Sequence, residues 1–192
     1  MVSRKNCRWP CTVCKGNCAS DAIFCEHCLE WAHYACENLN EDDFQQLSKV
    51  SCGYVCTRCC VDQCGRYDFK KSLQRLAIAS RNMKDLHHAA IIEQIFLRNH
   101  PFQSTRTKKP VGHGNRKIHQ YSKSMVSVYR AASQVPIHVT GDGNCLFNSV
   151  SVVVQGNEAL ASELRVRTCI ELVLNFAYYK NHSFYQDFRL VS

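Results

Sequence analysis

Apolar side chains in the middle of the chain recur at steps of three and four residues, which is the spacing of one face of an α-helix. The stripe consists of Leu76, Ala79, Met83, Leu86 and Ala90, thickened by Ile91, Ile92, Ile95 and Phe96. Asn99, His100 and Pro101 follow it as a stop signal. The pattern predicts one long amphipathic helix from about Phe69 to Arg98.

A polar stretch from Gln103 to Ser124 interrupts the apolar pattern. It contains Gly112 and Gly114 and several basic side chains: Arg106, Lys108, Lys109, Arg116 and Lys117. Such composition is typical of a linker, so we expect a basic flexible linker over residues 101–135. Its charge leaves open a second interpretation, contact with nucleic acid or a role in nuclear import.

Apolar periodicity returns after a glycine-rich turn at residues 140–144. Phe147, Val150 and Val154 fall on one face of a predicted helix that starts with Cys145. A helix N-terminus stabilises a thiolate, and the free backbone N–H groups of such a turn can point at a developing oxyanion. Cys145 is therefore a candidate nucleophile, although a lone cysteine is also a common buried apolar residue.

Charge divides the chain of 192 residues into three parts. Residues 1–65 carry 6 Lys/Arg against 8 Asp/Glu, residues 66–125 carry 13 against 3, and residues 126–192 carry 5 of each. The net charge of +8 thus comes from the middle. No apolar run approaches the roughly 18 to 20 residues that cross a bilayer, so we expect no membrane partner.

Cysteine is concentrated at the front of the chain, where 12 of the 14 cysteines lie in the first 64 residues. A segment of this size buries little apolar core and needs another source of stability. The N-terminus MVSRKNCRWPC lacks the apolar core of a signal peptide, which disfavours a secreted disulfide framework. We expect metal binding in a reducing, intracellular compartment, with the nucleus favoured.

Eight potential zinc ligands follow one another in the order four cysteines, one histidine and three cysteines. They are Cys11, Cys14, Cys25, Cys28, His33, Cys36, Cys56 and Cys59. A CxxC turn lets two sulfurs converge on one ion, and zinc takes thiolate and imidazole ligands in fours. The spacing predicts two Zn²⁺ ions.

This order resembles a PHD finger over residues 8–62, and Trp31 and Tyr54 stand where that family usually carries aromatics. The resemblance implies a small cross-braced α+β fold with few short strands. It also implies interleaved ligand sets, Cys11, Cys14, His33 and Cys36 for one ion and Cys25, Cys28, Cys56 and Cys59 for the other. Four protein ligands fill each site, which indicates a structural rather than a catalytic metal.

Two alternatives to this ligand assignment remain. A RING finger would use His27, but Cys28 directly after it leaves the wrong gap to the next ligand. Cys60 competes with Cys59, and the position of Tyr54 favours Cys59. We interpret the other nearby cysteines as spare thiols: Cys7, Cys18, Cys52 and Cys64.

PHD fingers commonly bind the basic tail of a histone as an added strand, with an aromatic cage or an acidic group that reads a lysine. By resemblance Trp31 matches one cage wall, and Ala22 stands where a second wall is expected. Asp21 and Glu26, together with Glu30, would instead favour an unmodified lysine. The competing interpretation is that Trp31 packs against the zinc core and that the acids are solvated surface.

The turn around Cys145 resembles the opening motif of the OTU family of cysteine deubiquitinases over residues 136–190. The resemblance implies Cys145 as nucleophile and Asp142 as a residue that shapes the oxyanion-hole loop. The sequence Glu163-Leu164-Arg165 and the apolar helix after it are similar to the family's second helix. The combination of such a finger with an OTU start also resembles transposon-like animal proteins.

A thiolate protease needs a histidine as general base, and in the OTU family that histidine lies near the C-terminal end of the domain. Only His182 follows Cys145 here. We therefore expect residues 136–192 to be an inactive N-terminal fragment of a truncated α/β OTU domain. The alternative is a deubiquitinase that acts on ubiquitin, is targeted by its finger and has the rest of its catalytic domain elsewhere.

These patterns together predict a zinc-stabilised finger over residues 8–62, a basic amphipathic helix over 67–100, a linker over 101–135 and an OTU-like fragment over 136–192. The expected fold is a small α+β finger followed by a mainly helical remainder. The function favoured by the sequence is binding of a peptide or histone tail, attached to an inactive OTU-like segment.

Overall fold

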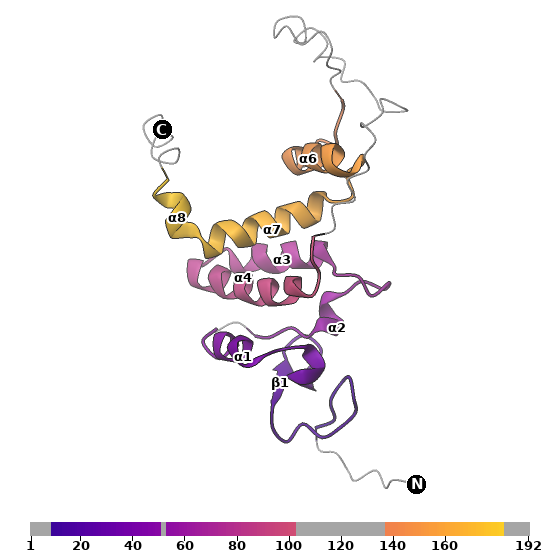
Figure 1. Ribbon diagram of the computed structural model, residues 1–192, viewed down its shortest axis with the longest axis vertical. Helices are drawn as coiled ribbons and strands as arrows, with labels where there is room; N and C mark the ends of the chain where they lie inside the picture. Colours follow the sequence, from indigo (N-terminus) through magenta and orange to yellow (C-terminus); the bar gives the residue numbers. More distant parts are fainter. Residues whose placement is uncertain (1–8, 51–52, 103–136, 183–192) are drawn as a thin grey trace, which may run out of the picture. The chain divides into compact units, whose positions relative to one another are not determined.

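The computed structural model describes residues 9–50, 53–102 and 137–182 (Figure 1). The described chain is rich in helix and contains one two-stranded sheet, as the sequence predicts in outline. It divides into two compact units, one formed by residues 1–101 with 166–192 and the other by residues 102–165. The predicted linker lies almost entirely outside the described residues.

The finger is built on an antiparallel hairpin of β1 (Ala22–Cys25) and β2 (Glu30–His33). The short helical elements η1 (Ala35–Glu37), α1 (Glu41–Leu47) and α2 (Thr57–Cys60) follow it along the chain. In the sheet, Ile23 is opposite Ala32 and Phe24 is opposite Trp31. These elements are too small to hold each other by packing alone, which agrees with a need for metal.

Helix α1 begins with a capping box. The Asn40 side chain accepts a hydrogen bond from the Asp43 N–H at 2.9 Å, and the Asp43 carboxylate accepts one from the Asn40 N–H at 2.9 Å. The same carboxylate is buried and forms an ion pair with Arg98. Although burial acts to raise the pKa of Asp43, its hydrogen bonds with Arg98 and Asn40 lower that pKa overall.

The predicted single helix from Phe69 to Arg98 is wrong, because the structure forms two helices there. They are α3 (Phe69–Ala79) and α4 (Met83–Arg98), which lie side by side (Figure 1). The Ser80 hydroxyl bonds the Ala77 carbonyl at 2.7 Å, and the Asn82 side chain caps α4 by accepting from the Lys84 N–H at 2.8 Å. These local polar bonds stop one helix and start the next, and the fold lets the two apolar faces cover each other.

The finger and this helical hairpin share one hydrophobic cluster. The ring of Tyr54, in the finger, lies 5.7 Å from the ring of Phe96 in α4. The cluster also contains the buried residues Cys25, Cys56, Cys60, Leu76, Ala90, Ile92 and Ile95. The hairpin is therefore part of the packing that surrounds the cysteine-rich segment.

The C-terminal part of the chain is helical, as predicted. It contains α6 (Cys145–Gln155), α7 (Ala161–Leu174) and α8 (Phe176–Lys180). The Ser151 hydroxyl closes the α6–α7 connection, donating to the Asn157 carbonyl at 2.6 Å and accepting from the Leu160 N–H at 3.0 Å. None of the helices in the described ranges has the length and apolarity needed to span a bilayer.

Candidate functional site

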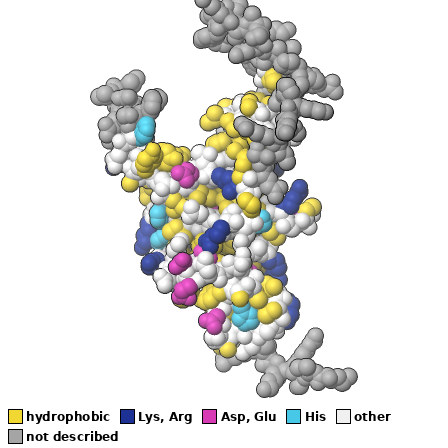
Figure 2. All heavy atoms as spheres, in the orientation of Figure 1, with side chains coloured by type: hydrophobic (Ala, Val, Ile, Leu, Met, Phe, Trp, Pro, Cys, Tyr) yellow, Lys and Arg dark blue, Asp and Glu magenta, His cyan; other side chains and the backbone are white. Residues whose placement is uncertain are grey.

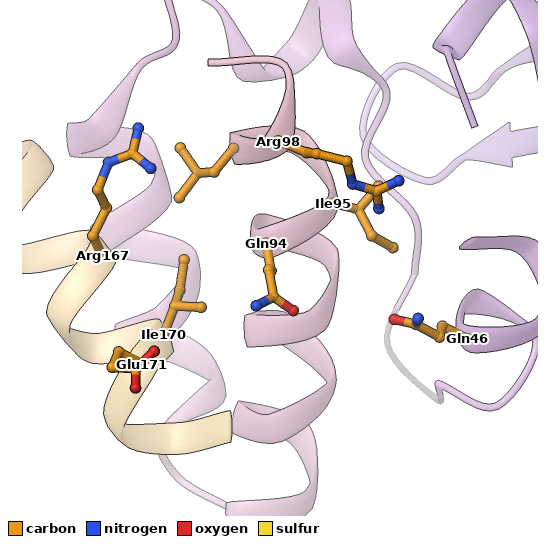
Figure 3. A pocket seen from close by; sticks show the side chains of 8 residues that line it. Gln46, Gln94, Ile95, Arg98, Arg167, Ile170 and Glu171 are labelled. Carbon is orange, nitrogen blue, oxygen red and sulfur yellow. The ribbon is translucent and has the colours of Figure 1, made fainter. Parts of the chain in front are cut away.

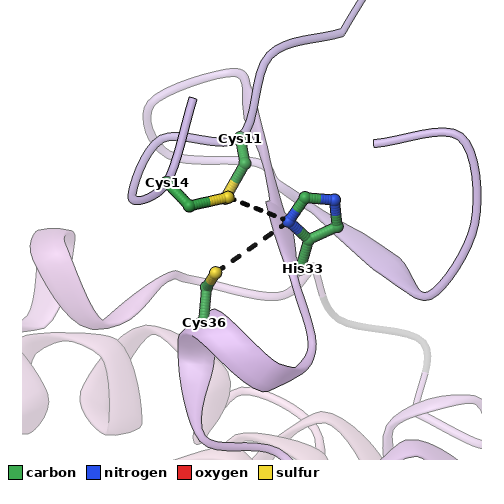
Figure 4. A group of neighbouring side chains, drawn as sticks. All are labelled: Cys11, Cys14, His33 and Cys36. Atoms are coloured by element: carbon green, nitrogen blue, oxygen red, sulfur yellow. Dashed lines mark hydrogen bonds between the residues drawn. The ribbon is translucent and has the colours of Figure 1, made fainter. Parts of the chain in front are cut away.

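Three sulfurs and one imidazole meet at the first cysteine group. Its members are Cys11, Cys14, His33 and Cys36, whose ligand atoms all lie within 4.8 Å of one another (Figure 4). The Nδ1 atom of His33 is 3.3 Å from the Cys14 sulfur and 3.9 Å from the Cys36 sulfur. The other ring nitrogen, Nε2, is 3.0 Å from the Asn17 carbonyl oxygen. A proton on Nε2 would be held by that carbonyl, which leaves the Nδ1 lone pair directed at the sulfurs, as in a metal-ligating histidine.

Backbone N–H groups of the loop lie close to two of these sulfurs. The Val13 N–H lies 3.4 Å from the Cys11 sulfur, and the Gly16 N–H lies 3.4 Å from the Cys14 sulfur. Gly16 fits closely here, since an added Cβ would stand 3.3 Å from the Cys14 sulfur. Burial acts to raise the pKa of Cys11, but backbone hydrogen bonds outweigh it and lower the pKa to about 6. The loop thus favours the thiolate, which is the form that binds metal.

The second group consists of sulfurs alone, from Cys25, Cys28, Cys56 and Cys59. Separations between sulfurs are 3.6 Å for Cys56 and Cys59, 3.8 Å for Cys28 and Cys56, and 4.0 Å for Cys25 and Cys59. A disulfide would need about 2.05 Å. Zinc–sulfur bonds of about 2.3 Å in a tetrahedron place two sulfurs about 3.8 Å apart. The observed spacing therefore suits a tetrahedral metal and excludes disulfides between these pairs.

Burial raises the pKa of one thiol in each group to about 11, that of Cys36 in the first group and that of Cys59 in the second. It also raises the pKa of Cys56, whereas backbone hydrogen bonds outweigh burial at Cys25 and lower its pKa. Four sulfurs this close can be ionised together only when a cation lies among them. The Cys56 N–H donates to the Cys25 sulfur at 3.2 Å, so part of the thiolate charge is met by the backbone.

The two groups alternate along the chain and contain the same sets of four that the sequence resemblance implies. Cys59 is in the second group, whereas Cys60 is buried outside it with its sulfur 3.9 Å from the Val55 carbonyl oxygen. Burial raises the pKa of Cys60 to about 12, which suits a neutral thiol in the core. His27, the histidine of the RING alternative, is exposed and lies outside both groups.

The residues considered for peptide binding do not all come together. Trp31 and Asp21 line one hollow of about 200 Å³ at the start of β1, together with Trp9 and Ala22. Glu26 lies at the other end of β1, where its N–H donates to the Tyr54 carbonyl at 3.0 Å.

The hollow has a second aromatic wall that sequence reasoning missed. The ring of Trp9 is 6.4 Å from the ring of Trp31, with an angle of 49° between the ring planes. The signal for it was an aromatic residue two positions before the first ligand, Cys11. Trp31 also lies 5.3 Å from the ring of Phe24, so it serves packing and lines the hollow at once.

The turn before α6 is held by side-chain hydrogen bonds to Asp142. Its carboxylate accepts from the Asn144 N–H at 3.0 Å and from the Asn148 side chain at 3.0 Å. Bonds from Asn144 lower the pKa of Asp142. Asn148, buried in α6, also donates to the Thr140 carbonyl at 2.9 Å and is a further residue that the sequence analysis did not single out.

Cys145 is the first residue of α6 and is exposed. The structure thus places it at the helix N-terminus, and Asp142 acts on the shape of the preceding turn. In the same unit, His138 interacts electrostatically with Glu158, whose carboxylate accepts from the Thr140 hydroxyl at 2.6 Å. Leu146, Val150 and Val153 are exposed apolar residues of α6. Hydrophobic side chains are visible on the surface in the region of this helix (Figure 2).

A larger hollow of about 440 Å³ within the first unit is lined by α1, α4 and α7 (Figure 3). Its two arginines already have partners, because Arg98 binds Asp43 and Arg167 donates to the His100 carbonyl. Its carboxylate, from Glu171, accepts a hydrogen bond from the Tyr179 hydroxyl at 3.1 Å. The charged groups of this hollow are thus engaged in holding the helices.

The family model described as Vertnin, OTU domain matches residues 136–190. A comparison with curated proteins and one with solved structures found no match. The match covers the Asp142 turn and helices α6, α7 and α8, and it agrees with the resemblance found in the sequence. The C-terminal part of the chain is therefore similar to an OTU-type domain, while the PHD-type assignment of the finger stays a prediction.

Proposed function

We propose that the finger is a PHD-type module that holds two structural Zn²⁺ ions. The observation that carries this is the convergence of eight ligand atoms into two groups, each within 4.8 Å. Each group supplies four protein ligands, so the ion has no open position for substrate. The role of the metal is to fold a segment that lacks a core of its own.

Metal content of purified variants tests this assignment. We expect two zinc ions per wild-type chain, and about one fewer in Cys14→Ser, which alters the first group, and in Cys28→Ser, which alters the second. Cys64→Ser is the matched control, since Cys64 is an exposed cysteine outside both groups and its loss should leave the zinc content unchanged. Elemental analysis with zinc standards gives the measurement. A wild-type content below one zinc per chain would contradict the proposal.

The surface of this module, in our proposal, binds an extended peptide along β1. The Tyr34 N–H donates to the Asp21 carbonyl at 2.8 Å, so the carbonyl group of Asp21 points toward the β2 side of the hairpin. Bonding direction alternates along a strand, which turns the backbone groups of Ala22 and Phe24 away from β2. An added strand could pair with that edge.

The hollow beside this edge fits a lysine side chain of the bound peptide. Trp9 and Trp31 offer two aromatic faces, and Asp21 offers a negative charge at the same place. Aromatic faces attract an ammonium or methylated ammonium group. Residues 1–65 also carry a net negative charge, which favours a basic peptide such as a histone tail.

Peptide titration tests the surface. We expect histone-tail peptides, unmodified or methylated at lysine, to bind the zinc-loaded chain, and Trp31→Ala to weaken the tightest of them at least tenfold. Val13→Ala is the control, because Val13 is exposed on the finger but does not line the hollow. Fluorescence anisotropy with labelled peptides gives the affinities. Equal binding by Trp31→Ala and wild type would refute this surface.

A second candidate function, cysteine deubiquitinase activity, is favoured by the exposed Cys145 at the start of α6 within the OTU-type match. A ubiquitin probe with a vinyl electrophile distinguishes it. An enzyme would be labelled in wild type and in Cys64→Ser, which lacks another exposed thiol, but not in Cys145→Ser. We expect no labelling of any of the three, in line with an inactive OTU-like segment.

A further inference from the structure

The exposed side of helix α3 carries positive charge that the described residues do not balance. Lys70 and Lys71 are exposed in its first turn, Arg81 is exposed just after its end, and Lys84 is exposed at the start of α4. Lys71 forms an ion pair with Asp68 at 3.6 Å. The other three cations have no ion pair among the residues that the structure describes. Unpaired cations gathered on one surface attract a polyanion.

The charge stands at both ends of the helix. Residues at steps of three and four share one side of a helix, so Lys70, Gln74 and Ala77 lie on the same side of α3, and all three are exposed. Arg81 lies in the connection to α4, beyond the other end. At 1.5 Å per residue the 11 residues of α3 span roughly 16 Å. Two uncharged residues therefore separate cations that are about one helix length apart.

The major groove of double-stranded DNA fits this arrangement. The groove is roughly 12 Å wide, admits an α-helix and has a phosphate backbone on each side. A helix of roughly 16 Å that crosses the groove brings the cations at its two ends to the two backbones. Gln74 and Ala77 then face the groove itself, where they place no charge.

Other polyanions suit this surface less well. Membrane surfaces bind helices that offer an apolar face beside the basic one, but the apolar side of α3, with Leu76 buried, packs on α4. Among the large apolar side chains of α3, α4 and their connection, only Ile78 and Met83 are exposed. Single strands stack on exposed aromatic rings, whereas Tyr67 is buried and Phe69 half-buried against it. Duplex RNA has a deep, narrow major groove that does not admit protein side chains.

We propose that helix α3 binds double-stranded DNA through its phosphate backbones, with Lys70 at one edge of the major groove and Arg81 and Lys84 at the other. The contacts go to phosphates, so binding does not depend on base sequence. Residues 103–125 add six Lys/Arg and no Asp/Glu to the positive charge of this part of the chain. The surface contains none of the residues of the metal groups or of the proposed peptide surface at β1.

Fluorescence anisotropy with a labelled DNA duplex tests this surface on the full zinc-loaded chain. We expect a Kd on the order of 10⁻⁵ M at about 150 mM salt. Lys70→Gln combined with Arg81→Gln should weaken binding about tenfold, and the slope of log K against log salt should become less steep by roughly 2, because two phosphate contacts are lost. Lys49→Gln combined with Lys180→Gln is the matched control. It removes the same charge from exposed side chains outside α3 and α4 and should bind DNA as wild type does.

Two further probes test the choice of partner, a duplex RNA of the same sequence and vesicles that contain phosphatidylserine. Both should bind more weakly than the DNA. Wild-type affinity in the Lys70 and Arg81 pair would overturn the proposal, since the contacts would then come from another segment. An equal loss in the control pair would overturn it too, because net charge rather than this surface would drive binding. Binding of the RNA or of the vesicles as tightly as the DNA would show that the partner is wrong.

Discussion

Removal of zinc with a chelator should unfold helices α3 and α4 together with the finger. The reason is the shared hydrophobic cluster, in which Cys25 and Cys56 of the second metal group are packed with Leu76 and Phe96 of the hairpin. When the cation is removed, the sulfurs take up protons and nothing links the separate segments that carry them. The finger then loses its structure, and the apolar face of the hairpin loses its cover. Structural zinc contributes roughly 10 to 16 kcal/mol in small modules, more than a domain of this size usually has in reserve.

Hydrogen exchange of backbone amides measures this effect by segment. In the zinc-loaded chain we expect protection in α4, and after chelation we expect exchange there to approach that of an unfolded peptide. Addition of zinc should restore the protection, which separates loss of metal from irreversible damage. If α4 stays protected while the finger exchanges freely, the two parts fold independently and the coupling is wrong.

The two cysteine groups should differ in how strongly their loss of zinc reduces the protection of α4. Cys28→Ser alters the group that borders the hairpin cluster, whereas Cys14→Ser alters the group packed with Cys18 and Ala32 in a separate small cluster. The loss of protection in α4 should therefore be larger for Cys28→Ser. Equal losses would mean that the finger unfolds as one body whichever ion is lost.

The pairs of ligands could be predicted from the sequence because their spacing is local, whereas the interleaved grouping of these pairs was implied by the resemblance to a PHD finger. A CxxC turn fixes two sulfurs within four residues, and His33 and Cys36 are separated by three. The choice of Cys59 over Cys60 also followed from a short-range feature, the position of Tyr54. Where the chemistry is encoded by neighbouring residues, pattern and structure agree.

The division of the predicted helix into α3 and α4 could not be predicted from periodicity. Apolar steps run through Ala79 and Met83 without a gap, and residues 80–82 contain neither glycine nor proline. The break depends on the Asn82 cap and on the gain from packing two helices against each other. Such a gain depends on tertiary structure, which overrides local propensity.

Contacts between residues far apart in the sequence could not be predicted from periodicity either. Arg98 binds Asp43 from 55 positions away, and the Asn38 side chain donates to that of Asn99 at 2.8 Å. The closeness of Trp9 and Trp31 likewise depends on the bridge between Cys11 and β2. These pairs determine how the finger packs on the hairpin and where the surface of the finger is hollowed. No periodic pattern in the sequence predicts them.

The apolar stripe of the sequence does not predict that Glu93 is buried. Its ionisable side chain is only 1% exposed. Its carboxylate accepts from the Ser72 hydroxyl at 2.7 Å, from the Tyr67 hydroxyl and from Arg75 Nε at 2.6 Å. Burial raises the pKa of Glu93 to about 8, and its carboxylate forms an ion pair with Arg75. The network ties α3, α4 and the segment before α3 to one buried group.

Glu93→Ala should lower the free energy of unfolding of the zinc-loaded chain by about 3 to 5 kcal/mol, because it leaves the partly buried Arg75 cation without its partner and leaves two hydroxyls without their acceptor. Denaturant titration followed by far-UV circular dichroism measures the loss. Glu30→Ala is the matched control: it breaks the ion pair with Arg58, in which both side chains are about half exposed, and should cost a small fraction of that amount.

The double variant Arg75→Met with Glu93→Met separates charge from packing. Because it removes the Arg75 cation together with its carboxylate partner, it should be more stable than Glu93→Ala, although Ser72 and Tyr67 still lose their acceptor. If the double variant is no more stable than Glu93→Ala, the unpaired charge is not the source of the loss. In that case the hydroxyl bonds to Glu93, rather than its pairing with Arg75, hold the hairpin to the preceding segment.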